Sequence, residues 1–277
     1  MQALFLGRLG LGDQIMLMGA IKHFSKEFDK LVVPCKPHSV GSVQLLMDQN
    51  NIKNVELLNL GKTDRNTNGS VVDFKGKEVK RSWAQSNIGQ YDRLAEEMSH
   101  NFSGEVIRSG VFNKKSWYRH FKGYKGSRLL KKTITVDRAF YRQLQLPIDL
   151  TFDIECSPGK MSDFVLDSLK PKEPYIFVQD DPGRGHSIAL EYLPKGIRII
   201  KPTIHTDSIF DYLPLMEGAE EVHLIDSCFA CMWDRSPYVY NSENYIHRYV
   251  RFHYGNPYYR AGFWSYFGDP VCKECRR

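Results

Sequence analysis

Short apolar runs alternate with segments of helical pattern along most of this chain. In its first half the apolar runs are residues 3–6, 31–33, 55–60 and 70–74, and helical patterns cover residues 14–28, 42–47 and 81–99. In its second half the apolar runs are residues 175–178, 197–200 and 222–225, and a helical pattern covers residues 208–216. This alternation is typical of βαβ units, whose strands lie parallel in one sheet. The sequence therefore predicts an α/β protein.

A polar, proline-containing stretch, residues 147–172, separates the two series of elements. A chain of 277 residues has room for two domains, because domains of roughly 100 to 150 residues are common. We predict an N-terminal domain over residues 1–155 and a C-terminal domain over residues 156–277, both Rossmann-like, with parallel sheets facing a central cleft. The aromatic segment 245–267 is too apolar to stay in water, and we expect it to pack back onto the first domain.

Composition excludes several classes of protein. Hydrophobic residues make up 42% and charged residues 25% of the chain, as in ordinary globular proteins, and no apolar run approaches the roughly 20 residues of a membrane span. The first residues lack the basic start of a secretory signal. Six cysteines are too sparse for a disulfide scaffold, which favours a reducing compartment. We therefore expect a cytoplasmic protein without a membrane span. The two CxxC pairs, Cys228 with Cys231 and Cys272 with Cys275, have no supporting histidine spacing, so no metal is expected.

The most specific local pattern is the glycine-rich turn between the first apolar run and the first helical segment. It contains Gly10-Leu11-Gly12-Asp13, which matches neither the dinucleotide fingerprint nor a phosphate loop. Because glycine has no Cβ, such a turn exposes backbone amides, and the helix that follows places its N-terminus beside them. An anion or a sugar is the kind of ligand that this arrangement suits.

Residues 6–28 resemble the opening of the metal-independent, two-domain glycosyltransferases of the heptosyltransferase-like group, in which a strand, a G-x-L-G-D turn and a long helix begin the acceptor domain. Residues 222–229 are similar to the D-[ST]-x-x-x-h turn of the same group, where a helix N-terminus holds the nucleotide pyrophosphate. The resemblance implies a GT-B-like fold and no metal cofactor. It also implies inverting transfer of a monosaccharide, hexosyl or pentosyl, from a nucleoside-diphosphate sugar, with UDP-sugars favoured. The acceptor would be a hydroxyl of a glycan or glycoprotein.

An inverting transfer needs a carboxylate within hydrogen-bond reach of the acceptor hydroxyl. The resemblance implies that Asp13 has this role and that Gly10, Leu11 and Gly12 bind the acceptor with it. Asp73 is the second candidate for the base, because it follows an apolar run and would lie at the carboxyl end of a parallel strand. An alternative is that Asp13 only caps a helix beginning at Gln14.

Three loops in the second half are predicted to bind the donor. Ser227 is a good N-cap residue, and the backbone amides after it would face a diphosphate. Arg184 lies between two glycines in the loop 179–187, where its guanidinium is free to contact phosphate oxygens of the leaving group. The loop 201–208 adds a lysine at the end of another strand. The predicted donor-binding residues are Arg184, His186, Lys201, Thr203, Asp226, Ser227, Cys228 and Phe229.

Other interpretations of these segments remain open. Asp181-Pro182-Gly183-Arg184-Gly185 is also typical of an exposed turn. Gln179-Asp180-Asp181 is the nearest approach to the DxD motif of metal-dependent glycosyltransferases. Residues 114–142 contain ten lysines or arginines and one acid, interleaved with aromatics, which is the pattern of a nucleic-acid-binding surface. Because the net charge of +6 is modest and no RNA-binding or zinc-finger motif accompanies the stretch, we do not expect a nucleic-acid partner. A non-catalytic glycan-binding protein is the other alternative.

Overall fold

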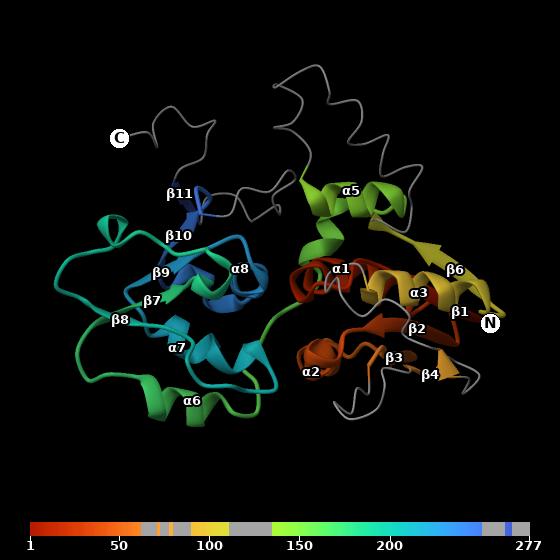
Figure 1. Ribbon diagram of the computed structural model, residues 1–277, viewed down its shortest axis with the longest axis horizontal. Coiled ribbons are helices and arrows are strands. Elements are labelled where there is room, and N and C mark those ends of the chain that lie inside the picture. Colours follow the sequence, from red (N-terminus) through yellow and green to blue (C-terminus); the bar gives the residue numbers. More distant parts are fainter. Residues whose placement is uncertain (62–70, 73–77, 80–89, 111–134, 251–263, 268–277) are drawn as a thin grey trace, which may run out of the picture. The chain divides into compact units, whose positions relative to one another are not determined.

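A computed structural model describes residues 1–61, 71–72, 78–79, 90–110, 135–250 and 264–267 of the chain (Figure 1). Contacts divide the chain into two compact units, one of residues 1–130 with 137–154 and one of residues 131–136 with 155–277. Each unit contains a parallel β-sheet with helices packed on it. The predicted α/β class with two parallel sheets is thus confirmed, whereas the acceptor and donor roles of the two halves stay predictions.

The sheet of the first unit has four parallel strands in the order β3-β2-β1-β6. Its strands are β1 (Gln2–Leu6), β2 (Lys30–Cys35), β3 (Val55–Asn59) and β6 (Glu105–Arg108). Its helices are α1 (Leu11–Phe24), α2 (Val40–Gln49), α3 (Gln90–His100) and α5 (Val136–Gln143). Chain order runs outward from β1 to β3 on one side, and β6 is then added on the other side of β1.

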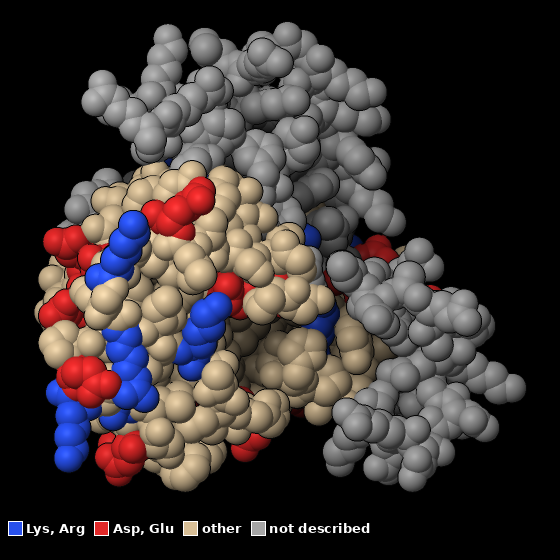
Figure 2. All heavy atoms as spheres, turned by 60° about the vertical axis from the view of Figure 1, so that its left-hand side comes forward, with Lys and Arg blue, Asp and Glu red and all other residues tan. Residues whose placement is uncertain are grey.

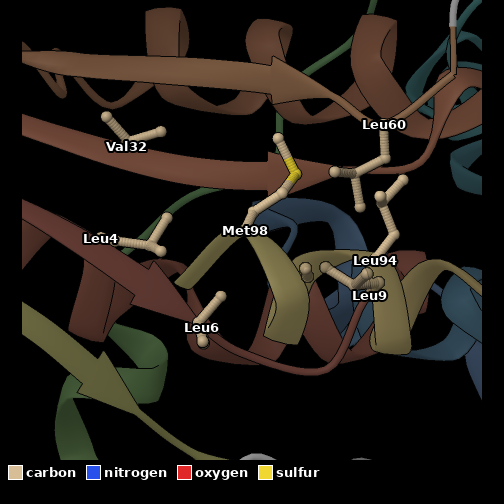
Figure 3. Close-up of a cluster of buried hydrophobic side chains, with 8 residues drawn as sticks. Leu4, Leu6, Leu9, Val32, Leu60, Leu94 and Met98 are labelled. Atoms are coloured by element: carbon tan, nitrogen blue, oxygen red, sulfur yellow. The ribbon is translucent and has the colours of Figure 1, made fainter. Parts of the chain in front are cut away.

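Alternation along β1 sends side chains to both faces of this sheet. Leu4 and Leu6 lie on the face that α3 covers, where they form one buried cluster with Leu94 and Met98 of that helix (Figure 3). Phe5 points to the other face, and its ring lies 6.0 Å from that of Phe24 in α1. The sheet therefore has a helix packed on each face.

Helix α1 is buried on nearly all sides, in contrast to the amphipathic helix that we predicted. All residues from Gln14 to Ile21 are buried, because the short helical turn η4 (Ile148–Phe152) covers the side of α1 that faces away from the sheet. Tyr141 and Thr151 both donate hydrogen bonds to the carbonyl of Met16, at 3.0 Å each. A Cβ at Gly19 would lie 1.7 Å from the carbonyl oxygen of Leu150, so this contact requires glycine.

The sheet of the second unit has five parallel strands in the order β11-β10-β9-β7-β8. Its strands are β7 (Tyr175–Gln179), β8 (Arg198–Ile200), β9 (Glu221–Leu224), β10 (Glu243–His247) and β11 (Ser265–Phe267). Its helices are α6 (Ser162–Leu169), α7 (Leu213–Glu217) and α8 (Cys228–Asp234). Phe177 packs between Tyr212 and Phe229 on one face, and Val178 packs with Ile188 and Leu193 on the other.

The aromatic C-terminal segment differs from our expectation where the structure describes it. Strands β10 and β11 extend the sheet of the second unit, and the remainder of residues 251–277 lies outside the described residues. On these strands Tyr245, His247 and Phe267 stack on one another and on His223 of β9, with ring centroids 4.7 to 5.4 Å apart. These rings thus pack within the second unit, where His223 and His247 are buried and Tyr245 and Phe267 are half-buried.

The predicted strand at residues 70–74 is also corrected. Strand β4 (Val71–Val72) pairs antiparallel with β5 (Glu78–Val79) in a separate two-stranded ribbon. It is therefore not a strand of the parallel sheet. No helix in the described part of the chain is long and apolar enough to span a membrane.

Candidate functional site

Each sheet has a switch point, where successive strands are added first on one side of a strand and then on its other side. Predicted site residues follow the strands at these points. In the first sheet β1 lies between β2 and β6, and in the second β7 lies between β8 and β9. Ligands of open parallel sheets bind outside the carboxyl ends of the strands at such a switch point. The glycine-rich turn follows β1, and Asp226 with Ser227 follows β9. The two predicted sites thus coincide with the positions that the topology favours.

The turn after β1 is shorter than its sequence suggested. Helix α1 begins at Leu11, its N-cap is Gly10, and no side chain caps it. Asp13 is therefore a residue of the first helical turn, and the alternative that it caps a helix starting at Gln14 is wrong. A carboxylate in the first turn of a helix is stabilised by the helix dipole, which suits Asp13 as an ionised base.

Two glycines of this turn are required by packing. A Cβ at Gly7 would lie 2.6 Å from a methyl carbon of Leu17, so glycine here lets α1 approach β1 closely. A Cβ at Gly10 would lie 2.5 Å from Oδ2 of Asp13. Since the φ angle of Gly10 is −69°, another residue could adopt this backbone conformation, but its Cβ would displace the Asp13 carboxylate. The turn leaves room for the Asp13 carboxylate.

Several charged residues that the sequence analysis did not select lie at the same edge of the sheet as Asp13. Nε of Arg8 lies 3.8 Å from Oδ2 of Asp13. Asp92, in the first turn of α3, is close enough to Arg8 and Lys36 for both cations to lower its pKa, although burial is the larger effect and raises the pKa overall. Lys36 follows β2, and its ammonium lies 5.8 Å from the ring centre of Tyr91. Asp13, Asp92, Arg8 and Lys36 are thus four charged residues at the carboxyl edge of this sheet.

The structure contradicts the reason for choosing Asp73 as the second candidate base. Asp73 itself lies outside the described residues, but the two residues before it belong to the antiparallel ribbon of β4 and β5. A carboxylate after such a strand is not placed at the carboxyl edge of the parallel sheet. Asp92 lies at that edge, in the first turn of α3, which falls largely within the predicted helical segment 81–99 but was not selected as a site.

In the second unit, the lysine predicted to face a diphosphate already has a partner. Nζ of Lys201, after β8, lies 2.9 Å from both carboxylate oxygens of Asp180, after β7. The same carboxylate accepts a hydrogen bond from the backbone amide of Ile188 at 3.2 Å. Asp180 thus organises the loop that contains Arg184, and its charge compensates that of Lys201.

Ser227 is the N-cap residue of α8, as predicted, but its side chain does not cap the helix. Its hydroxyl donates a 2.6 Å hydrogen bond to Oε1 of Gln179 at the end of β7. Asp226, beside it, is buried and lies 3.8 Å from Nε of Arg248, which follows β10. The guanidinium of Arg248 is 4.1 Å from the ring centre of Tyr266 on β11. Gln179 and Arg248 are therefore two further polar residues at this edge.

The remaining predicted donor residues have different surroundings. Phe229 is part of the core between Phe177 and Tyr212, so only its backbone amide is a candidate contact. The backbones of His186 and Asp181 form a two-residue bridge that closes the Arg184 loop, and Thr203 is exposed. Arg184 ends a short helical turn, Pro182–Arg184.

The metal-binding and nucleic-acid-binding alternatives involve residues that the structure describes only in part. No three His, Cys, Asp or Glu side chains in that part of the chain are grouped as metal ligands, and Cys231 is buried in α8. Cys272 and Cys275 lie outside the described residues, as do residues 114–134 of the basic stretch. On the described part of the surface in Figure 2, acidic and basic side chains are intermingled.

No family model matches the chain, and no curated protein matches its sequence. Among solved structures, the glycosyl transferase family 9 protein from Veillonella parvula DSM 2008 is similar with a TM-score of 0.48 and 11% sequence identity, over 96% of this chain and 86% of that one.

Proposed function

We propose that this protein is a glycosyltransferase that transfers a monosaccharide from a nucleoside-diphosphate sugar to a hydroxyl group of a glycan, with inversion and without a metal ion. The observation that supports this most is the position of the predicted residues at the topological switch points of two parallel sheets. Ligand sites of α/β proteins lie at such points. The first unit would bind the acceptor and the second the donor.

On the acceptor side, Asp13 is the proposed general base. Its carboxylate would accept the proton of the acceptor hydroxyl as that oxygen attacks the anomeric carbon and the bond to the diphosphate breaks. Arg8 lies beside this carboxylate. Gly10, Leu11 and Gly12 would contact the acceptor through the backbone at the start of α1.

On the donor side, the departing diphosphate gains negative charge, so cations near it act most strongly in the transition state. Because Lys201 is paired with Asp180, we assign this role to Arg184. The Ser227 to Gln179 hydrogen bond connects the ends of β7 and β9, which fixes the backbone of Cys228 and Phe229. Their amides are the proposed contacts to the phosphate oxygens.

A thermal-shift experiment with UDP, and with a panel of other nucleoside diphosphates and their sugars, tests the donor site. A ligand that binds only the folded protein raises its melting temperature. We expect a shift of equal size with and without EDTA. A shift that disappears on chelation would contradict metal-independent binding, and no shift with any member of the panel would contradict a donor site.

The base is tested by release of nucleoside diphosphate from the sugar that binds. Asp13→Asn keeps the size of the side chain but cannot accept a proton at neutral pH. We expect turnover to fall by roughly 100-fold or more while donor binding stays nearly unchanged. Donor binding without turnover in the unaltered protein would favour the non-catalytic, glycan-binding alternative.

A further inference from the structure

Arg8 and Gly110 face each other across the switch point of the first sheet. Arg8 follows β1 and Gly110 follows β6, two strands that are paired in register at Leu6 and Arg108. Gly110 has a φ angle of +64°, and a Cβ there would lie 3.0 Å from Cγ of Arg8. Its amide donates a 2.6 Å hydrogen bond to Oε1 of Gln143 in α5. The aliphatic part of Arg8 therefore lies against a fixed segment of backbone.

The guanidinium of Arg8 has two carboxyl groups in its neighbourhood. Asp13 in α1 is 3.8 Å from Nε, and Asp92 in α3 is close enough for the Arg8 charge to act on its pKa. Lys36, which follows β2, acts on Asp92 more strongly than Arg8 does, and it also lowers the pKa of His38, whose burial acts in the same direction. Arg108, the last residue of β6, is a further cation at this edge, and it donates a hydrogen bond to Oγ of Ser99 in α3.

The space around the ion pair depends on a glycine on each side. Gly10 leaves room for the Asp13 carboxylate, and Gly110 leaves room for the Arg8 side chain. A salt bridge on an open surface costs side-chain entropy and contributes little. Here both partners are only partly exposed, with 38% of the Arg8 side chain and 19% of the Asp13 side chain accessible to solvent, and the Arg8 stem is already held in place.

We propose that Arg8 is a positioning residue, which keeps the Asp13 carboxylate ionised and oriented at the end of β1. A nearby guanidinium favours the charged form of a carboxyl group. The Asp13 carboxylate would then remain ionised, and able to accept a proton, at lower pH than the carboxylate of an isolated aspartate. The proposal rests on the proposed function only in that Asp13 is the general base. The effect of the Arg8 charge on the Asp13 carboxyl group does not depend on a bound substrate.

The test is the titration of the Asp13 carboxyl carbon by NMR in the full chain, labelled at aspartate and with the signal identified by its loss in Asp13→Asn. In Arg8→Gln we expect the midpoint of that titration to rise by about one pH unit, the lower end of the effect of a neighbouring arginine. Arg8→Lys keeps the charge and should restore most of the shift. Arg198→Gln, which removes an exposed arginine paired with Glu173, is the control and should leave the midpoint unchanged.

Gly10→Ala provides a second approach that leaves Arg8 intact. The new methyl group has an allowed backbone conformation but displaces the Asp13 carboxylate, so the midpoint should rise in this variant as well. An unchanged midpoint in Arg8→Gln would overturn the proposal. So would an Arg8→Lys midpoint as high as that of Arg8→Gln, because packing and not charge would then be responsible. Failure of UDP binding or turnover would contradict the proposed function and leave this titration unaffected.

Discussion

The buried histidine pair of the second sheet should make its stability depend on pH. His223 on β9 and His247 on β10 are almost completely buried, and Nδ1 of His223 lies 2.9 Å from Nε2 of His247. Nε2 of His223 lies 2.7 Å from Oε2 of Glu221. If His223 donates to Glu221, its Nδ1 accepts from His247. This arrangement needs His223 to be neutral, and a proton added to Nδ1 of His247 would be buried with no acceptor among the described residues.

Burial and the neighbouring His223 lower the pKa of His247 to about 3, whereas an unfolded histidine titrates near pH 6.5. Burial also lowers the pKa of His223, against the opposing effect of Glu221. Below about pH 6.5 the unfolded chain therefore binds a proton that the native state does not, and stability falls as the pH falls. For His247 the slope is about 1.4 kcal/mol per pH unit, or about 2 kcal/mol lost by pH 5.

The assay compares the unaltered protein with His247→Gln by urea unfolding and by hydrogen exchange of peptides from β9 and β10, at about pH 7.5 and about pH 5. Glutamine keeps a donor for His223 but does not titrate. Near neutral pH the variant should be less stable than the unaltered protein. On acidification its free energy of unfolding should fall by about 2 kcal/mol less than that of the unaltered protein. His205→Gln, at an exposed histidine, is the matched control. A stability difference between the unaltered protein and His247→Gln that is independent of pH would refute the reasoning.

Three further predictions concern single substitutions. Gly19→Ala should lower the free energy of unfolding, measured in urea, by about 1–3 kcal/mol or more, because the added Cβ meets the Leu150 carbonyl. The control Gly41→Ala, at an exposed glycine of α2, should instead raise it by up to about 1 kcal/mol. Equal effects of the two substitutions would contradict the packing argument. Arg184→Ala should lower the rate of nucleoside-diphosphate release more than it weakens donor binding, and unchanged turnover would show that this arginine only forms a turn. Asp73→Asn should leave turnover near that of the unaltered protein, and loss of turnover there would move the role of base from Asp13.

The sequence by itself determined where most helices and strands lie. It also identified the two candidate site segments, the glycine-rich turn after β1 and the Asp226-Ser227 turn after β9. Apolar runs and turn residues identified six of the nine strands described in the two parallel sheets, because side-chain burial on a strand or helix follows a short repeat, but they missed β6, β10 and β11. The apolar run at residues 3–6 and the glycines after it also predicted a strand, a turn and a helix at the start of the chain. Their spacing could not show that Gly10 leaves room for the side chain of Asp13.

Tertiary structure alone decided which strands are neighbours and which side chains meet. Strand order places Arg8 beside Gly110, and Ser227 beside Gln179, although these residues are far apart in the sequence. It also excludes β4 from the parallel sheet and pairs Lys201 with Asp180. The physical reason is that strand pairing and the partners of a charged side chain depend on contacts between distant segments, whereas periodicity describes only the environment of each segment by itself.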